Sequence, residues 1–247
     1  DEWNKIQAAS KTSYPETPKG DQTSLDDQVR TQYGVYVGME YTVGDFIYRV
    51  TAIDSITSGR TKLIGVVAAK KSKLTKVTVP NTANFKGYGL NVTEVGDNAF
   101  KAMKKLKKVT FGANVKVIGN AAFSNCKKLN KINFKNVTTI GNNAFAGCKA
   151  LKKLTIGSKV TTIGKNAFKK CTKLKTVVIG KSVKTIKAKA FTKDNKIKKI
   201  TFKGKKLKTV KKNALSSKVK KNIKTKKTKL KGNKKAIKVF KKKLKIK

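Results

Sequence analysis

The sequence repeats itself with a period of about 23 residues. Five phenylalanines, each directly after an alanine, recur at intervals of 23, 22, 23 and 23 residues: Phe100, Phe123, Phe145, Phe168 and Phe191. A unit of this length is too short to bury an apolar face alone, so such units stack on one another around a continuous core. The period therefore predicts an α/β repeat solenoid, rich in β-structure, that offers an extended surface.

The regular units have apolar residues at fixed positions, followed by an Ile-Gly pair, an Ala-Phe pair and then a small residue, whereas later Lys187 replaces the glycine and Asp194 the small residue. In three units that small residue is a cysteine: Cys126, Cys148 and Cys171. We predict that the phenylalanines and cysteines are structural core positions, because thiols stacked in a line do not converge on a metal ion. The glycines of the Ile-Gly pairs are interpreted as turn glycines: Gly119, Gly141 and Gly164.

The composition divides the chain into four segments. The polar composition of residues 1–34 predicts a flexible leader or linker. Residues 35–73 are predicted to form a β-rich N-terminal cap with a hairpin whose turn is Gly44-Asp45. Residues 74–217 hold about six repeat units of 22–24 residues each. In residues 218–247 lysines alternate with single apolar residues, which favours a capping strand with a mobile end over a frayed tail.

The net charge of +49 is concentrated in the repeats and the segment behind them. Residues 1–100 carry 12 basic and 11 acidic side chains, whereas residues 101–247 carry 49 lysines and a single acid, Asp194. The three arginines all precede this basic region. Lysine is a hydrated point charge, whereas arginine reads guanine edges and clamps phosphate, so the composition favours diffuse attraction to polyanions.

Side chains alternate between the two faces of a strand, and stacking brings equivalent positions to about 4.8 Å. Two outward columns follow, the first being Lys76, Lys108, Lys131, Lys153, Thr176 and Lys199. The second is Thr78, Thr110, Asn133, Thr155, Val178 and Thr201. We predict that a polyanion binds this face through Lys76, Lys108, Lys131, Lys153, Lys199, Thr110, Thr155 and Thr201. The alternative is that the lysines only keep a β-rich surface soluble and block edge association.

Other function classes lack the residues they need. Without histidine and with few carboxylates, no nucleophile–base pair or metal site can be assembled, so we expect no catalytic residue, no cofactor and no metal. No apolar run approaches 18 residues, so no transmembrane segment is expected. A chain that begins Asp-Glu-Trp indicates a mature or truncated form, with a signal peptide already removed.

The repeat has the form Ile-Gly-x-x-Ala-Phe-x-x-Cys-x-x-Leu-x-x-Ile-x-Ile, with apolar substitutes at single positions, at residues 118–134 and 163–179. This pattern resembles the BspA-type leucine-rich repeat of bacterial surface proteins, over roughly residues 74–215. The resemblance implies a right-handed leucine-rich-repeat superhelix on an extracellular or cell-surface protein with a role in adhesion. It transfers no catalytic residue. The lysine density, and Gly or Lys in place of a proline after the strand, depart from the family.

Three functions remain open. The preferred hypothesis is a non-enzymatic binding module whose lysine-rich face contacts wall teichoic acid, sulfated or sialylated glycans, or acidic host proteins. Nucleic-acid binding is the second, since charge alone supports it. The basic region lacks arginines and aromatic side chains beside the lysines, so no specific nucleic acid is expected as a partner. The third is a structural stalk or spacer within a larger surface protein.

Overall fold

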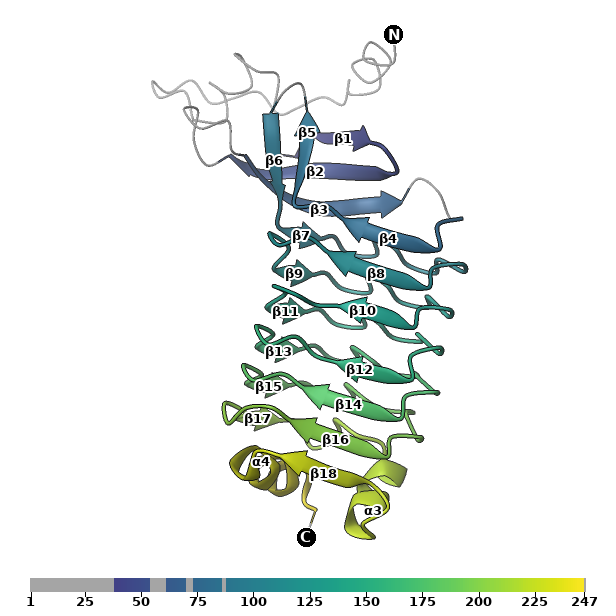
Figure 1. The fold of residues 1–247 in the computed structure, drawn as a ribbon, viewed down its shortest axis with the longest axis vertical. Helices are drawn as coiled ribbons and strands as arrows, with labels where there is room; N and C mark the ends of the chain where they lie inside the picture. The colour runs from purple at the N-terminus through teal and green to yellow at the C-terminus, as the bar shows by residue number, and fades with distance from the viewer. Residues whose placement is uncertain (1–37, 54–60, 70–72, 86–87, 247) are drawn as a thin grey trace, which may run out of the picture.

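The computed structural model describes residues 38–53, 61–69, 73–85 and 88–246. The chain winds into an elongated β-solenoid, with a β-sheet region at its N-terminal end and two helices at its C-terminal end (Figure 1). The solenoid predicted from the repeat period is confirmed. The predicted leader, residues 1–34, lies outside the described residues.

The N-terminal end is built from two antiparallel hairpins and a connecting strand. Its strands are β1 (Glu40–Val43), β2 (Phe46–Ile53), β3 (Thr61–Ala69), β5 (Thr82–Phe85) and β6 (Tyr88–Val92). The β1–β2 turn is Gly44-Asp45, as predicted, and Gly44 adopts a φ of 59° that glycine tolerates without strain. Strand β3 pairs antiparallel with β2 and parallel with β7, the first short strand of the solenoid. The N-terminal strands and the short strands of the solenoid therefore form one continuous sheet.

Each turn of the solenoid contributes one longer and one two-residue strand. The longer strands are β4 (Lys76–Val79), β8 (Lys108–Phe111), β10 (Lys131–Asn133), β12 (Lys153–Thr155), β14 (Thr176–Ile179), β16 (Lys199–Phe202) and β18 (Lys229–Gly232). The short strands are β7 (Glu94–Val95), β9 (Val117–Ile118), β11 (Thr139–Ile140), β13 (Thr162–Ile163), β15 (Thr185–Ile186) and β17 (Thr209–Val210). The short strands form one uninterrupted parallel stack, whereas the longer strands form two separate parallel sheets.

A column of stacked phenylalanine rings runs through the core. The five repeat phenylalanines are buried, and successive ring centroids lie 5.0, 5.2, 5.4 and 5.6 Å apart with nearly parallel planes. Phe46 of the N-terminal hairpin packs edge-on against Phe100, with its centroid at 6.0 Å. Aromatic contacts of this kind add to the hydrophobic burial, so the column joins each repeat to the next.

Two left-handed residues shape each Ala-Phe bend, one before the alanine and one two positions after the phenylalanine. They have φ values between 53° and 76° and are Asn98, Ala102, Ala121, Asn125, Asn143, Gly147, Asn166, Lys170, Lys189 and Lys193. Asparagine and glycine adopt this conformation readily, whereas lysine and alanine are strained there. The two left-handed positions therefore belong to the repeat itself, and residues of several types occupy them.

The glycines of the Ile-Gly pairs have a different role from the predicted one. None of Gly119, Gly141 and Gly164 has a positive φ. A Cβ on Gly141 would lie 2.7 Å from the carbonyl oxygen of Gly119 in the preceding repeat. Glycine is needed at these positions because the backbones of neighbouring repeats approach closely, and not because the chain makes a tight turn there.

The C-terminal segment contains two helices that the sequence analysis does not predict. Helix α3 (Ser217–Lys224) is capped by Ser216, and helix α4 (Lys234–Leu244) by Asn233, whose side chain accepts the Ala236 N–H at 3.0 Å. The apolar residues that appear to alternate with lysine are buried at four-residue spacing: Val219 and Ile223 in α3, and Ala236, Phe240 and Leu244 in α4. That spacing places them on one face of a helix, which covers the end of the core.

Candidate polyanion-binding surface

The predicted outward columns are in register along the first of the two longer-strand sheets. Strand β8 pairs with β4 on one side and with β10 on the other. Lys108 therefore stands between Lys76 and Lys131, and all three side chains are exposed. In the second column Thr110 stands between Thr78 and Asn133, and its side chain is half-buried.

The second sheet continues both columns beyond their predicted end. Lys153 pairs with Thr176, which pairs with Lys199, while Thr155 pairs with Val178, which pairs with Thr201. Strand β18 then adds Lys229 beside Lys199 and Lys231 beside Thr201, and both lysines are exposed. Sequence reasoning missed these two lysines because helix α3 separates β18 from the last recognisable repeat. The alternating Lys229-Leu230-Lys231 was the available signal.

The columns are interrupted between β10 and β12, which do not pair. In regular units the N–H groups just after the core leucine bond to the preceding repeat: those of Lys175 and Thr176 both donate to the Lys152 carbonyl. Among the described residues no such bond joins the N–H groups of Lys152 and Lys153 to Asn130. The backbone pairing that holds the column in register is therefore absent at the step from Lys131 to Lys153.

A shortened turn after β10 accounts for the interruption. Residues 134–137 form a turn one residue shorter than residues 156–160 of the next unit, and this is where the 22-residue interval arises. The Phe134 carbonyl closes the short turn by accepting the Val137 N–H at 2.7 Å, whereas in the next unit Gly157 accepts from Val160. The Phe134 carbonyl is therefore not available to accept a hydrogen bond from the next unit. The equivalent carbonyl of Ile179 does accept one, from the Lys203 N–H at 3.0 Å.

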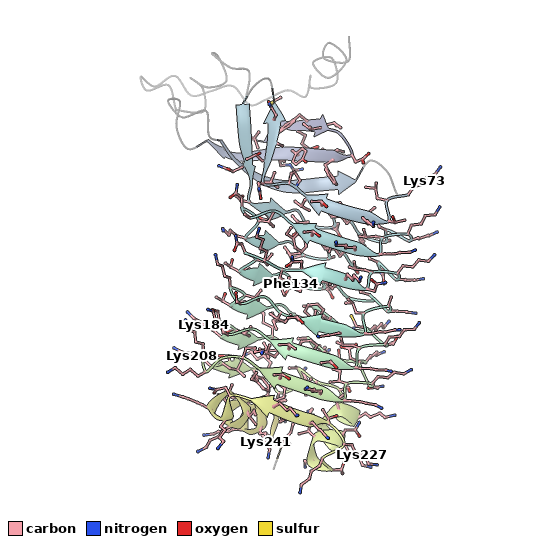
Figure 2. The ribbon with its side chains drawn as sticks, in the orientation of Figure 1. Lys73, Phe134, Lys184, Lys208, Lys227 and Lys241 are labelled. Carbon is pink, nitrogen blue, oxygen red and sulfur yellow. The ribbon has the colours of Figure 1, made fainter. Side chains whose placement is uncertain are left out.

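Lysines lie on other sides of the solenoid as well as on the predicted face. Figure 2 shows Lys184 and Lys208 projecting at the edge near the short strands, and Lys73 projecting at the opposite edge. Between described residues the one ion pair is Arg49–Glu40, with Arg49 Nε and Glu40 Oε1 2.9 Å apart, and it lies in the N-terminal hairpin. The lysines of the repeats thus have no carboxylate partner among the described residues.

The three repeat cysteines are buried, free thiols. Each thiol donates to the carbonyl of a phenylalanine in the preceding repeat, with sulfur–oxygen distances of 3.0, 3.3 and 3.4 Å. Burial raises the pKa of Cys126 to about 11 and raises the pKa values of Cys148 and Cys171 well above the ordinary value of a thiol. Thiols of this kind are unreactive, so these residues serve packing and not chemistry.

Asp194 takes the place of the cysteine in the following repeat. Its side chain is fully buried, and neither carboxyl oxygen has a hydrogen-bond partner. Burial raises the pKa of Asp194 to about 8. The described residues hold no group of three or more His, Cys, Asp or Glu side chains that could bind a metal ion. None of the described helices is both long and apolar enough to cross a bilayer.

Comparisons with known proteins agree with this architecture. The family described as BspA type leucine rich repeat region matches residues 91–230 in six copies, which is more than half of the chain. No curated protein matches the chain. A leucine rich cell surface protein from Faecalibacterium prausnitzii A2-165 is 26% identical, with a TM-score of 0.53 over 71% of this chain and 51% of that one.

The pneumococcal vaccine antigen PcpA shares the fold at 19% identity, with a TM-score of 0.62. The match covers 81% of this chain and 51% of the antigen. The chain thus spans about half the length of both matched structures.

Proposed function

Because this chain belongs to the BspA-type leucine-rich-repeat family, we propose that it is a non-enzymatic binding protein of the bacterial cell surface whose ligands are anionic polymers. The surface location is supported by the name of the Faecalibacterium prausnitzii protein, which shares the fold and is 26% identical over the matched 71% of this chain. Sulfated or sialylated glycans, teichoic acids and acidic proteins are the ligand classes with the required charge.

The observation that carries the proposal is the display of unpaired lysines in register. Lysines lie on three successive strands of the first longer-strand sheet and on β16 and β18 of the second, where Thr176 stands between Lys153 and Lys199. No carboxylate of the described residues pairs with these lysines. Neighbouring charges about 5 Å apart repel by roughly 0.8 kcal/mol in water. Solubility alone requires a net charge of only about 2–8 in a small domain, far below the +49 of this chain. A bound polyanion would relieve this repulsion.

Binding of this kind depends steeply on salt, because the polymer releases its condensed counterions when lysines replace them. The test is the affinity for dextran sulfate and for purified wall teichoic acid at 50 and 300 mM NaCl. We expect a loss of at least about tenfold across that range, as for other multivalent phosphate or sulfate contacts. An affinity that does not change with salt contradicts the proposed mechanism.

A matched pair of variants separates the predicted face from the charge of the whole solenoid. Lys108→Gln with Lys199→Gln removes two charges from the lysine column, and Lys184→Gln with Lys208→Gln removes two charges near the short strands. We expect the first pair to weaken polymer binding more than the second. Equal losses would assign binding to the overall charge, and equal affinity for DNA would show that any polyanion suffices.

A further inference from the structure

Three departures from the repeat pattern meet where the longer-strand sheet is interrupted. The first is the shortened turn at residues 134–137, which ends the pairing of β10. The second is Asn130, whose position is lysine in four other units: Lys107, Lys152, Lys175 and Lys198. The third is Ala150, whose position is lysine in five other units: Lys73, Lys105, Lys128, Lys173 and Lys196. Two long side chains are therefore missing next to the two strands that do not pair.

A groove of about 660 Å³ opens at this place. Asn130, Lys131 and Ile132 line it from the β10 side, and Ala150, Lys152, Lys153, Thr155 and Lys173 line it from the β12 side. Its volume falls within the roughly 300–1,000 Å³ typical of small-molecule sites. The short strands β9, β11 and β13 remain paired behind it, so the opening is confined to one side and the solenoid stays intact.

The groove combines cationic walls with apolar surface. Four lysine ammonium groups, the Thr155 hydroxyl and the Asn130 amide supply hydrogen-bond donors. Ile132 is half-buried, whereas the equivalent Val109 and Leu154 are fully buried. Ile132 and Ala150 are both partly exposed and give the groove an apolar surface.

We infer that this groove binds a short segment of an anionic oligosaccharide with sulfated or carboxylated sugar units. A sugar ring has an apolar C–H face that fits against Ile132 and Ala150, while its acidic groups pair with the lysines and its hydroxyls with Thr155 and Asn130. The lining contains no aromatic or arginine side chain on which a nucleic-acid base would stack. The inference rests on the proposed function and narrows it to one place.

The first test replaces two groove lysines and compares them with a matched control. Lys152→Gln with Lys173→Gln removes two charges from the groove. Lys175→Gln with Lys198→Gln removes two exposed charges one to two units along the solenoid, outside the groove. With a heparin hexasaccharide as the probe, we expect the groove variant to lose roughly tenfold in affinity and the control less than about twofold.

The second test closes the groove without removing any charge. A glycine inserted after Phe134 restores the 23-residue spacing and frees the Phe134 carbonyl to join the ladder with the next unit. We expect this insertion to abolish saturable hexasaccharide binding, while long-chain dextran sulfate still binds in a salt-dependent manner. Circular dichroism and the urea midpoint show whether the inserted chain remains folded.

The outcomes separate the groove from the general proposal. Equal losses in the two double-lysine variants, or no hexasaccharide binding to the unaltered protein, overturn the groove and leave salt-dependent polymer binding standing. Hexasaccharide binding that depends on Lys152 and Lys173 supports the groove even if long polymers show no preference for the lysine columns. A tighter complex with an oligonucleotide of equal charge than with the hexasaccharide also overturns the assignment to a glycan.

Discussion

The buried carboxyl of Asp194 makes the stability of the solenoid depend on pH. The folded protein keeps the Asp194 proton up to about pH 8, whereas the unfolded chain releases it near pH 4. Between these values the unfolded state binds fewer protons, so the free energy of unfolding falls as the pH rises, by about 1.4 kcal/mol per pH unit. The accumulated loss at pH 7 is on the order of 4 kcal/mol relative to pH 4.

Replacing Asp194 by the residue of the preceding repeats removes this loss. Cys126, Cys148 and Cys171 fit the same position as neutral thiols, so Asp194→Cys is expected to raise the stability at pH 7 by several kcal/mol. Asp194→Asn keeps the shape of the carboxyl but does not titrate. In both variants the free energy of unfolding should therefore lose the pH dependence that Asp194 causes. The gain from Asp194→Asn should be smaller, since the buried amide still needs hydrogen-bond partners.

The assay is the urea midpoint of both variants and of the unaltered protein at pH 5, 6, 7 and 8. The chain has no histidine, and burial raises the pKa values of the repeat cysteines, so few other groups titrate in this window. Burial also raises the pKa of Glu94, but this carboxyl is retained in the variants and cancels from the difference. A gap between variant and unaltered protein that stays constant from pH 5 to pH 8 would refute the reasoning.

Two further substitutions test the packing of the repeats. Gly141→Ala places a Cβ 2.7 Å from the Gly119 carbonyl oxygen, so we expect a loss of about 1–3 kcal/mol in urea unfolding; an unchanged midpoint would mean that the turns separate easily. Lys189→Gly removes the strain of a left-handed lysine at φ 57°, which costs about 1–2 kcal/mol in the folded state. The substitution also raises the conformational entropy of the unfolded chain, which lowers the free energy of unfolding by about 0.5–1 kcal/mol. We expect a net gain of about 0.5–1 kcal/mol, whereas Lys184→Gly, with the same charge change at an ordinary φ, should destabilise.

The regular features of this fold could be predicted because they repeat. The phenylalanine period gives the unit length, and strand alternation then assigns Lys108 and Lys131 to one outward column without any knowledge of the bends. The left-handed lysines could not be predicted in the same way. Lys189 and Lys193 have no intrinsic preference for a positive φ, and they adopt it because the neighbouring turns impose the bend.

The misassigned features are those in which two patterns compete. At the C-terminus, lysines between single apolar residues resemble a strand, but the four-residue spacing of Ala236, Phe240 and Leu244 matches a helix. Ser216 and Asn233 were the available cap signals for the two helices. The interrupted sheet was also visible as the 22-residue interval, but the interval alone does not say which hydrogen bonds the missing residue removes.

That interruption changes what the surface can recognise. Along a perfectly regular column a polymer can shift by one repeat and meet the same groups again, so every position has nearly the same free energy and none is preferred. Such a surface gives avidity without a defined site. At the step from β10 to β12 the spacing, Asn130 and Ala150 all differ from the other units, so a ligand unit bound there loses its contacts when it shifts. We therefore expect selectivity in a repeat protein of this kind to arise at irregular units, and the shortened turn after Phe134 supplies one.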